Sequence, residues 1–314
     1  MAQQSFTPGC FMLRTRDFIV LFVSYSTMAG GIFFPSLEPL LHDAPFYCVI
    51  ILLFLSFLPL RVVDLLRVVR ERPGSVAALV GLKNLLLPAF VYIVAREVCP
   101  EYALGVLILS AISSAVLGPF FAGLVGADIA LVVTVLVFSS LSVPVSLPFL
   151  ISVMAGTQTS MDMGAMIRML AMVILVPALA AEGVNRFAPE PGRGVMRFGF
   201  PISLACIMFT NLGVFSRYSA FFLANPEALP VALAIACVLG GVFLFVGGVL
   251  YRNRGVEEQL AAMISLGCLN NVLALVFCAR FFGPTEASVI AMYSITLFLL
   301  IIPLQLTAGI RKRG

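Results

Sequence analysis

The chain has 314 residues, of which 61% are hydrophobic and only 11% are charged, and its net charge is +4. A soluble domain carries about 25% charged residues, so this composition excludes a soluble protein and indicates a polytopic membrane protein in a lipid bilayer. The cysteines are odd in number and lie mostly in apolar runs, which argues against a disulfide framework. The basic residues mark membrane topology, and we expect no nucleic-acid partner.

Ten apolar runs of about 20 residues, the length that spans a bilayer, follow one another with short loops between them. They cover residues 18–36, 45–61, 75–95, 102–122, 128–154, 161–181, 197–215, 229–250, 259–279 and 287–308. The fifth run contains Pro144 and Pro148, so we expect it either to kink or to end early. No soluble appendage is predicted, and residues 1–314 are expected to form one membrane domain.

The Lys and Arg residues predict how these spans are oriented. With ten spans and a cytoplasmic N-terminus, the outer side receives only Arg96, Arg217 and Arg280, while Lys83 and Arg168 fall inside spans. The other basic residues fall on the cytoplasmic side: Arg14, Arg16, Arg61, Arg67, Arg70, Arg72, Arg186, Arg193, Arg197, Arg252, Arg254, Arg311, Lys312 and Arg313. We therefore expect a multi-pass protein of the cell (inner) membrane with both termini in the cytoplasm.

Five spans followed by five spans begin their two halves on opposite sides of the membrane. This arrangement predicts an all-α fold made of two inverted five-helix repeats, about 18–154 and about 161–308. Two polar interruptions occupy corresponding places in the halves, because both fall in the fourth span of their repeat. Interrupted spans can cross near the membrane midplane, where their backbone groups line a water-filled cavity.

The interruption in the fourth run is Ser110–Pro119, and the one in the ninth run lies within Met263–Val276. The second contains the adjacent amides of Asn270 and Asn271, which are costly at bilayer depth unless protein or water satisfies them. Paired broken spans of this kind point to the binding site of a transporter.

No carboxylate is expected near the membrane centre, because every Asp and Glu falls in a loop or at the end of a span. The usual partner of a sodium ion or a transported proton is therefore missing. His42 reads as an ordinary solvated residue. Motifs of metalloproteases, nucleotide-binding proteins and serine hydrolases are absent, and the cysteines are not at metal-ligand spacing. We expect no enzymatic activity, no cofactor and no metal site.

Lys83 is the most informative charge in the chain. It lies about nine residues into the third run, or roughly 13 Å deep at about 1.5 Å per residue, close to the midplane of a core about 30 Å thick. Its side chain either snorkels to the cytoplasmic interface or faces a cavity between the broken spans, where it binds an anionic substrate or releases a proton. Ser113, Ser114, Asn270 and Asn271 would line the same substrate site, although the two serines could equally bond back to the preceding turn.

Several segments resemble the bile acid:sodium symporter family. They are F-L-P-L-R-V-V-D-L at 57–65, E-R-P at 71–73, K-N-L-L-L-P at 83–88, G-A-D-I-A-L at 126–131 and E-Q-L-A-A-M-I-S-L-G-C-L-N-N at 258–271. This family has ten spans in two inverted five-helix repeats, with the fourth and ninth spans unwound where they cross. The resemblance implies the same architecture here and the activity of a secondary transporter.

The sodium ligands of that family are missing from this chain. The ninth-span motif Glu-x-Gly-x-Gln-Asn is replaced by Ser265, Leu266, Gly267, Cys268, Leu269 and Asn270, a fourth-span Ser-Asn pair by Gly118 and Pro119, and fifth-span hydroxyls by Val132 and Leu136. A third-span glutamine of the family aligns with Lys83. The resemblance therefore implies that Lys83 supplies the missing sodium charge, with Ser265 beside it in the former ion-coupling site.

We thus expect a transporter that moves a small or amphipathic organic anion by alternating access, with coupling to protons, to exchange or to nothing. The alternative is a membrane receptor or scaffold that retained the symporter fold and lost transport, since loss of the ion site without a replacement predicts that outcome. An arsenite-type carrier is disfavoured, because such carriers use a fourth-span cysteine and the fourth run has none. The sequence leaves the substrate, the direction of transport and the oligomeric state open.

Overall fold

The computed structural model describes residues 15–156 and 162–311, and within these ranges it is all-helical. The first half contains α1 (Thr15–Phe33), η1 (Pro35–Leu37), α2 (Glu38–Leu41), α3 (Ala44–Phe57), α4 (Val62–Glu71), α5 (Pro73–Gly81), η2 (Leu82–Leu86), α6 (Leu87–Val98), η3 (Pro100–Tyr102), α7 (Ala103–Ala111), α8 (Gly118–Val125) and α9 (Ile129–Ala155). The described part of the chain has no strand, and one isolated antiparallel bridge joins Ser114 to Leu269.

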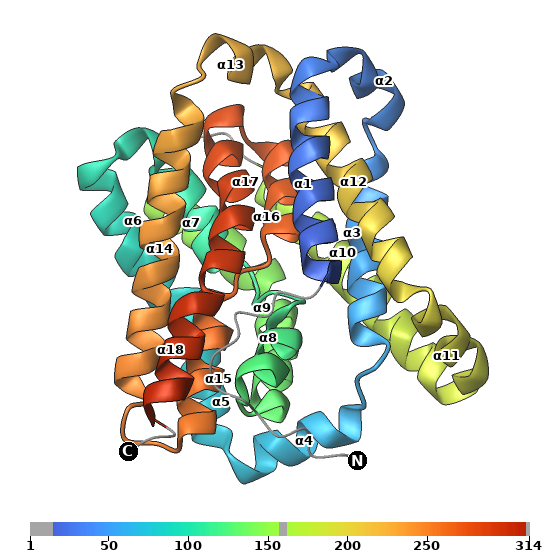
Figure 1. Ribbon diagram of the computed structural model, residues 1–314, viewed down its shortest axis with the longest axis vertical. Helices are drawn as coiled ribbons and strands as arrows, with labels where there is room; N and C mark the ends of the chain where they lie inside the picture. Colours follow the sequence, from blue (N-terminus) through green and yellow to red (C-terminus); the bar gives the residue numbers. More distant parts are fainter. Residues whose placement is uncertain (1–14, 157–161, 312–314) are drawn as a thin grey trace.

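The second half contains α10 (Met163–Phe187), α11 (Pro189–Arg197), α12 (Gly199–Arg217), α13 (Ser219–Ala224), α14 (Ala228–Leu250), α15 (Val256–Gly267), α16 (Asn271–Phe281), α17 (Pro284–Leu299) and α18 (Ile301–Arg311). The long helices run roughly along the long axis of the molecule (Figure 1). Short helices lie at its ends, with α2 and α13 at the top of that view and α4 crossing the bottom.

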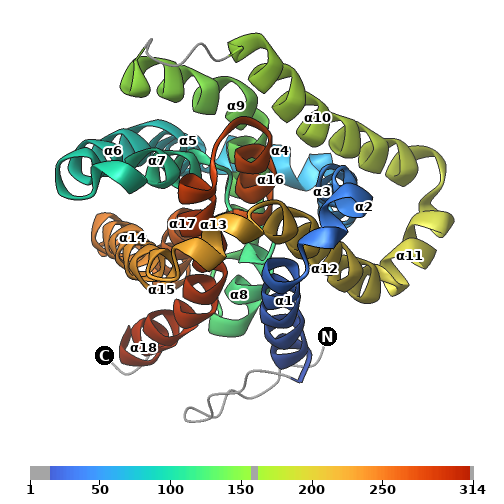
Figure 2. The ribbon, with the colours of Figure 1, turned by 90° about the horizontal axis from the view of Figure 1, so that it is seen from above.

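The long helices form two groups. In the first, which we call the panel, α12 packs against α1 and α3, and α3 packs against α10. In the second, the core group of α5–α9 and α14–α18, α14 packs against α15 and α17, and α7 packs against α6 and α17. Seen from above, the panel lies on one side and most of the core group on the other, with α16 between them (Figure 2).

Six helical stretches in the described residues are long and apolar enough to cross a membrane. They are Pro73–Val98, Ile129–Ala155, Met163–Phe187, Gly199–Arg217, Ala228–Leu250 and Pro284–Ile310, and the pair Pro35–Leu41 and Ala44–Phe57, bent by 63°, gives a seventh if it is one span. Pro100–Ala111 and Asn271–Phe281 are shorter apolar helices. Six or seven stretches therefore meet the length and composition of a span. Of the other expected runs, 18–36 is the continuous 19-residue helix α1, and 102–122 and 259–279 are interrupted helices.

The prolines act differently in different helices. The helix α9 continues through Pro144 and Pro148 for 27 residues, so the expectation that the fifth run could end early at these prolines is wrong. In the third run, η2 is a π-helical turn that carries Lys83 and Asn84 and is followed by Pro88. Proline lacks an N–H and its ring clashes with the carbonyl four residues earlier, which accounts for the wider turn here.

Loops that are distant in the sequence meet at the end of the molecule where α4 lies. Arg72 pairs with Asp128 at 2.5 Å, and the Ser75 hydroxyl donates to Glu258 at 2.8 Å. The backbone N–H of Asp128 also donates to the carbonyl of Glu257. This end therefore brings together several of the residues expected to be cytoplasmic, whereas Arg14, Lys312 and Arg313 lie outside the described residues. Orientation relative to the membrane stays a prediction.

Small residues allow close packing in the core group. A Cβ added to Gly247 of α14 would lie 2.8 Å from the Cα of Met263 on α15, so these two backbones touch. Between membrane helices, where lipid removes most of the hydrophobic driving force, such close contacts stabilise association.

We therefore predict that Gly247→Ala lowers the thermal stability of the purified protein, because the added methyl group meets backbone that cannot rotate away. Overpacking of this kind costs about 1–3 kcal/mol. The matched control is Gly241→Ala on the same helix, where an added Cβ meets nothing within 4 Å and alanine favours the helix by about 0.5–1 kcal/mol. Equal melting temperatures for the two variants, measured with a thiol-reactive dye in detergent, would contradict this packing.

Candidate functional site

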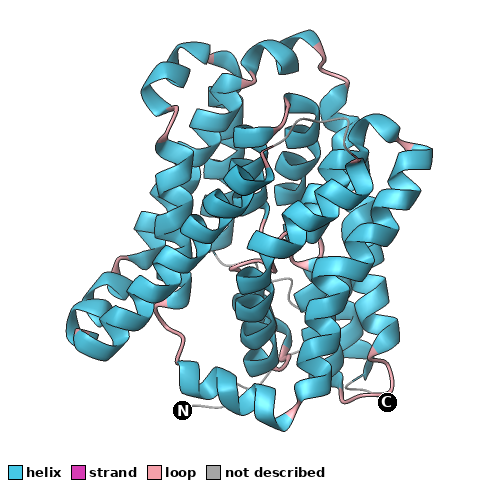
Figure 3. Ribbon diagram, turned by 180° about the vertical axis from the view of Figure 1, so that it is seen from behind, coloured by secondary structure: helices cyan, strands magenta, loops and turns pink. Residues whose placement is uncertain are grey.

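The two sequence interruptions lie against each other in the folded protein. The helix α7 ends at Ala111 and α8 begins at Gly118, whereas α15 ends at Gly267 and α16 begins at Asn271. The N–H of Ala115 donates to the carbonyl of Cys268 at 2.6 Å, and the N–H of Asn270 donates to the carbonyl of Ser113 at 3.0 Å. Loop segments are visible between helices near the middle of the molecule (Figure 3). Each break thus satisfies part of the backbone of the other.

Both amides of the ninth run are accounted for by contacts within the protein. The side chain of Asn270 caps α16, since its oxygen accepts a hydrogen bond from the N–H of Leu273 at 3.2 Å. The side-chain nitrogen of Asn271 donates to the hydroxyl of Ser294 on α17 at 2.5 Å. Asn270 therefore starts the second half of this broken helix, and Asn271 ties it to the next one.

Lys83 is fully buried, with 0% of the residue exposed. Its Nζ donates to the carbonyl of Ser110 at 2.7 Å and also to the carbonyl of Ile112. These carbonyls lie at the end of α7, where a helix has no internal donors left and carries the negative end of its dipole. The expectation that Lys83 could snorkel to the interface is wrong, because the ammonium ends on backbone oxygens inside the protein.

The surroundings of the Lys83 ammonium contain no carboxylate. The Nζ lies 5.8 Å from the ring centroid of Phe243 on α14, within the range of a cation–π contact. The buried polar and charged side chains of the described residues include neither Asp nor Glu. A protonated Lys83 would therefore be stabilised by carbonyl dipoles, the helix end and an aromatic ring.

The other broken helix has an equivalent donor, which the sequence analysis missed. The hydroxyl of Tyr293 on α17 donates to the carbonyl of Gly267, the last residue of α15. The available signal was a tyrosine inside an apolar helix, since a buried phenol usually has a hydrogen-bond partner. The helices α7 and α15, which are the first halves of the two broken helices, thus each have a C-terminal carbonyl that accepts a hydrogen bond from a side chain of another helix.

Ser139 of α9 is a second residue that the sequence analysis missed. Its hydroxyl accepts from the N–H of Ser114 at 3.2 Å, and its carbonyl accepts from the side-chain amide of Asn84 at 2.8 Å. The hydroxyl of Ser114 in turn donates to the carbonyl of Ser265 at 2.6 Å. The predicted Ser114 and Ser265 are therefore brought together, and Ser139 connects their neighbourhood to η2.

Three buried polar atoms near the breaks and η2 keep unused hydrogen-bonding capacity. Within the described residues, the hydroxyls of Ser113 and Ser265 and the side-chain oxygen of Asn84 have no hydrogen-bond partner. An unsatisfied buried group costs about 1–3 kcal/mol, so each one calls for an explanation such as a ligand or ordered water. Ser146, Thr210 and Gln259 carry such atoms elsewhere in the described residues. Ser113 and Ser265 were both predicted site residues.

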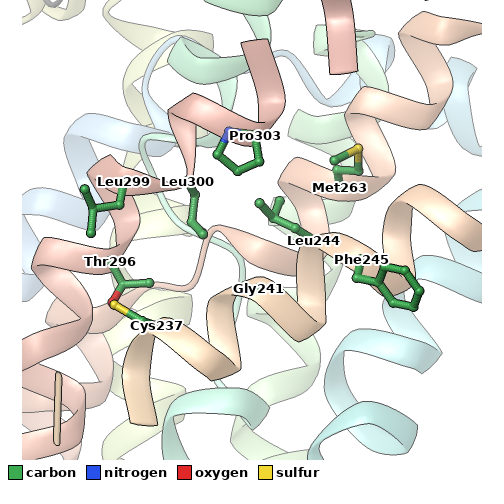
Figure 4. Close-up of a pocket in the computed structure, with 9 residues that line it drawn as sticks. All are labelled: Cys237, Gly241, Leu244, Phe245, Met263, Thr296, Leu299, Leu300 and Pro303. Atoms are coloured by element: carbon green, nitrogen blue, oxygen red, sulfur yellow. The ribbon is translucent and has the colours of Figure 1, made fainter. Parts of the chain in front are cut away.

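Two cavities of the structure lie away from these side chains. One, of about 380 Å³, lies between α14, α15, α17 and α18 and is mostly apolar; Figure 4 shows Met263, Leu244 and Thr296 among its lining residues. The other, of about 1070 Å³, lies beside α4 and α11. Neither is lined by Lys83, Ser113, Ser114, Ser265, Asn270 or Asn271. Lys83, Ser113, Ser114, Ser265 and Asn270 are all buried in this structure.

Within the described residues, no three His, Cys, Asp or Glu side chains are grouped so that they could hold a metal ion. His42 instead pairs with Glu38 on the surface at 2.9 Å.

We predict that Lys83→Met lowers the stability of the protein, because methionine has a similar length but leaves the carbonyls of Ser110 and Ile112 without a donor. The expected cost is on the order of 1–3 kcal/mol for each buried group left unsatisfied, measured as a fall in melting temperature in detergent. Leu86→Met is the matched control, since Leu86 is on the same η2 turn and 65% exposed. An unchanged or higher melting temperature for Lys83→Met would show that the amine does not secure the break.

Comparison with known sequences identifies the family. A sequence model described as Sodium Bile acid symporter family matches residues 46–225, which is more than half of the chain. The uncharacterized protein YbaS of Bacillus subtilis (strain 168) is 25% identical over 190 residues, which cover 59% of this chain and 60% of that protein. The chain thus matches less than two thirds of the length of this relative. The family is one of membrane transporters rather than enzymes, and this chain, a multi-pass helical membrane protein, belongs to the Sodium Bile acid symporter family.

Proposed function

We propose that this protein is a secondary transporter with ten spans in two inverted five-helix repeats, about 18–154 and about 161–308. The order of elements in the two halves supports this architecture. In the first half, α1, α2, α3, α4 and the α5–α6 segment precede the broken pair α7 and α8, and α9 follows. In the second half, α10, α11, α12, α13 and α14 precede the broken pair α15 and α16, and α17 and α18 follow. The broken pairs are then the fourth and ninth spans.

Transport would proceed by movement of the core group against the panel. The hydrogen bonds between the two breaks lie within the core group, so the crossing point can move as one body. Alternating exposure of a fixed site near broken helices is the usual behaviour of transporters built from inverted repeats. The end of the molecule that carries α4 would face the cytoplasm of a cell (inner) membrane, as the distribution of arginines favours.

The ammonium of Lys83 takes the role of a sodium ion in this proposal. It already occupies two carbonyls at the end of α7, and a metal cation brought to the same oxygens would meet a positive charge at contact distance. Ser265 offers a hydroxyl where sodium-coupled relatives are expected to carry a carboxylate. The residues present therefore do not fit a sodium ion, and the carrier would be uncoupled from sodium.

A small or amphipathic organic anion is the substrate class that the charges favour. A buried ammonium without a buried carboxylate produces a positive potential in a region of low dielectric, which attracts an anion more strongly than it would in water. Ser113, Ser114, Asn270 and Asn271 would line its site once the core group and the panel separate. The single observation that carries this proposal is the bonding of Lys83 to the end of a broken helix in the absence of a compensating carboxylate.

We predict that uptake or counterflow of organic anions into proteoliposomes continues unchanged when all sodium is replaced by potassium, because no sodium ligand set remains. Lys83→Ala should reduce the rate at least tenfold, whereas Arg96→Ala, which removes a cation from the far end of α6, should not. Liposomes without protein serve as the blank. A strict requirement for sodium would refute the uncoupling claim.

A receptor or scaffold is the second candidate, and the burial of Lys83 and Asn270 favours testing it. We predict that an organic anion which raises the melting temperature of the wild type has little effect on Lys83→Ala and Asn270→Ala. The probes are individual organic anions ranging from short carboxylates to bile salts, and Asn225→Ala, in the loop after α13, is the control. Binding that depends on both residues without any counterflow would support the receptor, and equal stabilisation of all variants would exclude this site.

A further inference from the structure

The cavity of about 1070 Å³ lies at the end of the molecule that carries α4, outside the region of the breaks. It is bounded by the end of α3, the following loop, the start of α4, the end of α10, and α11. Its lining residues are Leu58, Pro59, Leu60, Arg61, Val62, Val63, Asp64, Arg67, Glu182, Asn185, Arg186, Gly192 and Met196. The loop after α3, the helix α10 and the connecting helices α4 and α11 thus border one space.

Hydrogen bonds between α10 and the loop after α3 fix the shape of the cavity. The side-chain amide of Asn185 on α10 donates to the carbonyl of Leu58 at 2.9 Å and to that of Leu60 at 3.2 Å. These bonds fix the loop after α3 against the end of α10. The shape of the cavity therefore depends on two anchored segments and not on side-chain rotamers alone.

Arg61, Arg67 and Arg186 are among the residues that line this cavity, together with Asp64 and Glu182. The ion pairs found among the described residues involve none of these three arginines. Arg186 instead lies 5.6 Å from the ring of Phe187. The cavity thus has an excess of positive charge, in planar groups whose donors match the oxygens of a phosphate.

Apolar side chains lie beside these arginines. Val63 and Leu66 of α4 are 69% and 57% exposed, and Phe187 at the end of α10 is 81% exposed. The helix α4 combines this apolar surface with Arg67 and Arg70, which is the pattern of a helix that lies in the membrane interface. A soluble anion would not cover this apolar surface, whereas an amphiphile with an anionic head would.

We propose that this cavity binds an anionic phospholipid, with the phosphodiester on Arg61, Arg67 and Arg186 and the acyl chains along Val63, Leu66 and Phe187. Basic pockets between membrane helices on the cytoplasmic side bind lipid head groups by the same chemistry. The helix α4 connects α3 of the panel to α5 of the core group, so a lipid held here would contact the helix that joins the two groups.

The test uses the full-length protein in detergent and phosphatidylglycerol as the probe, with phosphatidylcholine and inorganic phosphate as comparisons. Native mass spectrometry measures retained lipid, and thermal unfolding measures stabilisation. We expect phosphatidylglycerol alone to stabilise the wild type, and Arg67→Gln/Arg186→Gln to weaken its binding at least tenfold, since each arginine near the membrane surface contributes about 1 kcal/mol.

The matched control is Arg70→Gln/Arg197→Gln, which removes the same charge from α4 and α11 outside the cavity. Arg67→Lys/Arg186→Lys keeps both positive charges and should retain part of the phosphatidylglycerol binding. Retained binding would show that changes at these two positions do not prevent folding. If the cavity and control variants lose equal amounts of phosphatidylglycerol binding, the lipid is attracted to the basic surface in general, and the proposal is overturned. Stabilisation by phosphatidylcholine or by inorganic phosphate equal to that by phosphatidylglycerol would overturn it as well. None of these results depends on transport activity or on Lys83.

Discussion

A broken helix inside a membrane leaves carbonyl and amide groups that lipid cannot hydrogen-bond, and this constraint shapes the centre of the protein. The fold meets it in two ways. The breaks exchange backbone hydrogen bonds, from Ala115 to Cys268 and from Asn270 to Ser113. Side chains from other helices then complete each helix end, Lys83 on α7 and Tyr293 on α15. Almost every polar residue near the breaks is explained first by this requirement.

The same constraint separates structural from functional polar groups. Asn270 and Asn271 have partners within the protein, so their presence alone does not require a ligand. Ser113 and Ser265 lack side-chain partners in the described part of the chain, and they are the stronger candidates for contact with a substrate. Lys83 completes a helix end, and under the proposed function its charge would also take the place of a bound cation.

Much of the architecture could be predicted from the sequence, because long apolar runs and their interruptions are strong signals in membrane proteins. The interruptions at Ser110–Pro119 and Met263–Val276 follow from such patterns, whereas the sequence left Lys83 either at the interface or inside, and the structure buries it. The partners of these residues do not follow from such patterns. Ser139 and Tyr293 reach the breaks from the next helices along the chain, 25 and 26 residues beyond their partners. The capping role of Asn270 depends on where α16 starts. Side-chain pairing across helices depends on tertiary packing, which hydropathy does not encode.

The π-helical turn at Leu82–Leu86 has a consequence for the evolution of this chain. A π turn holds one more residue than an α turn, and in an α-helix each residue rotates the following side chains by about 100°. The faces of α5 and α6 are therefore set out of phase, which lets Lys83 and the later Tyr92 and Ala95 all be buried. A one-residue deletion here would restore a regular helix and turn one of these faces toward lipid. The position of the amine thus depends on the number of residues in this turn.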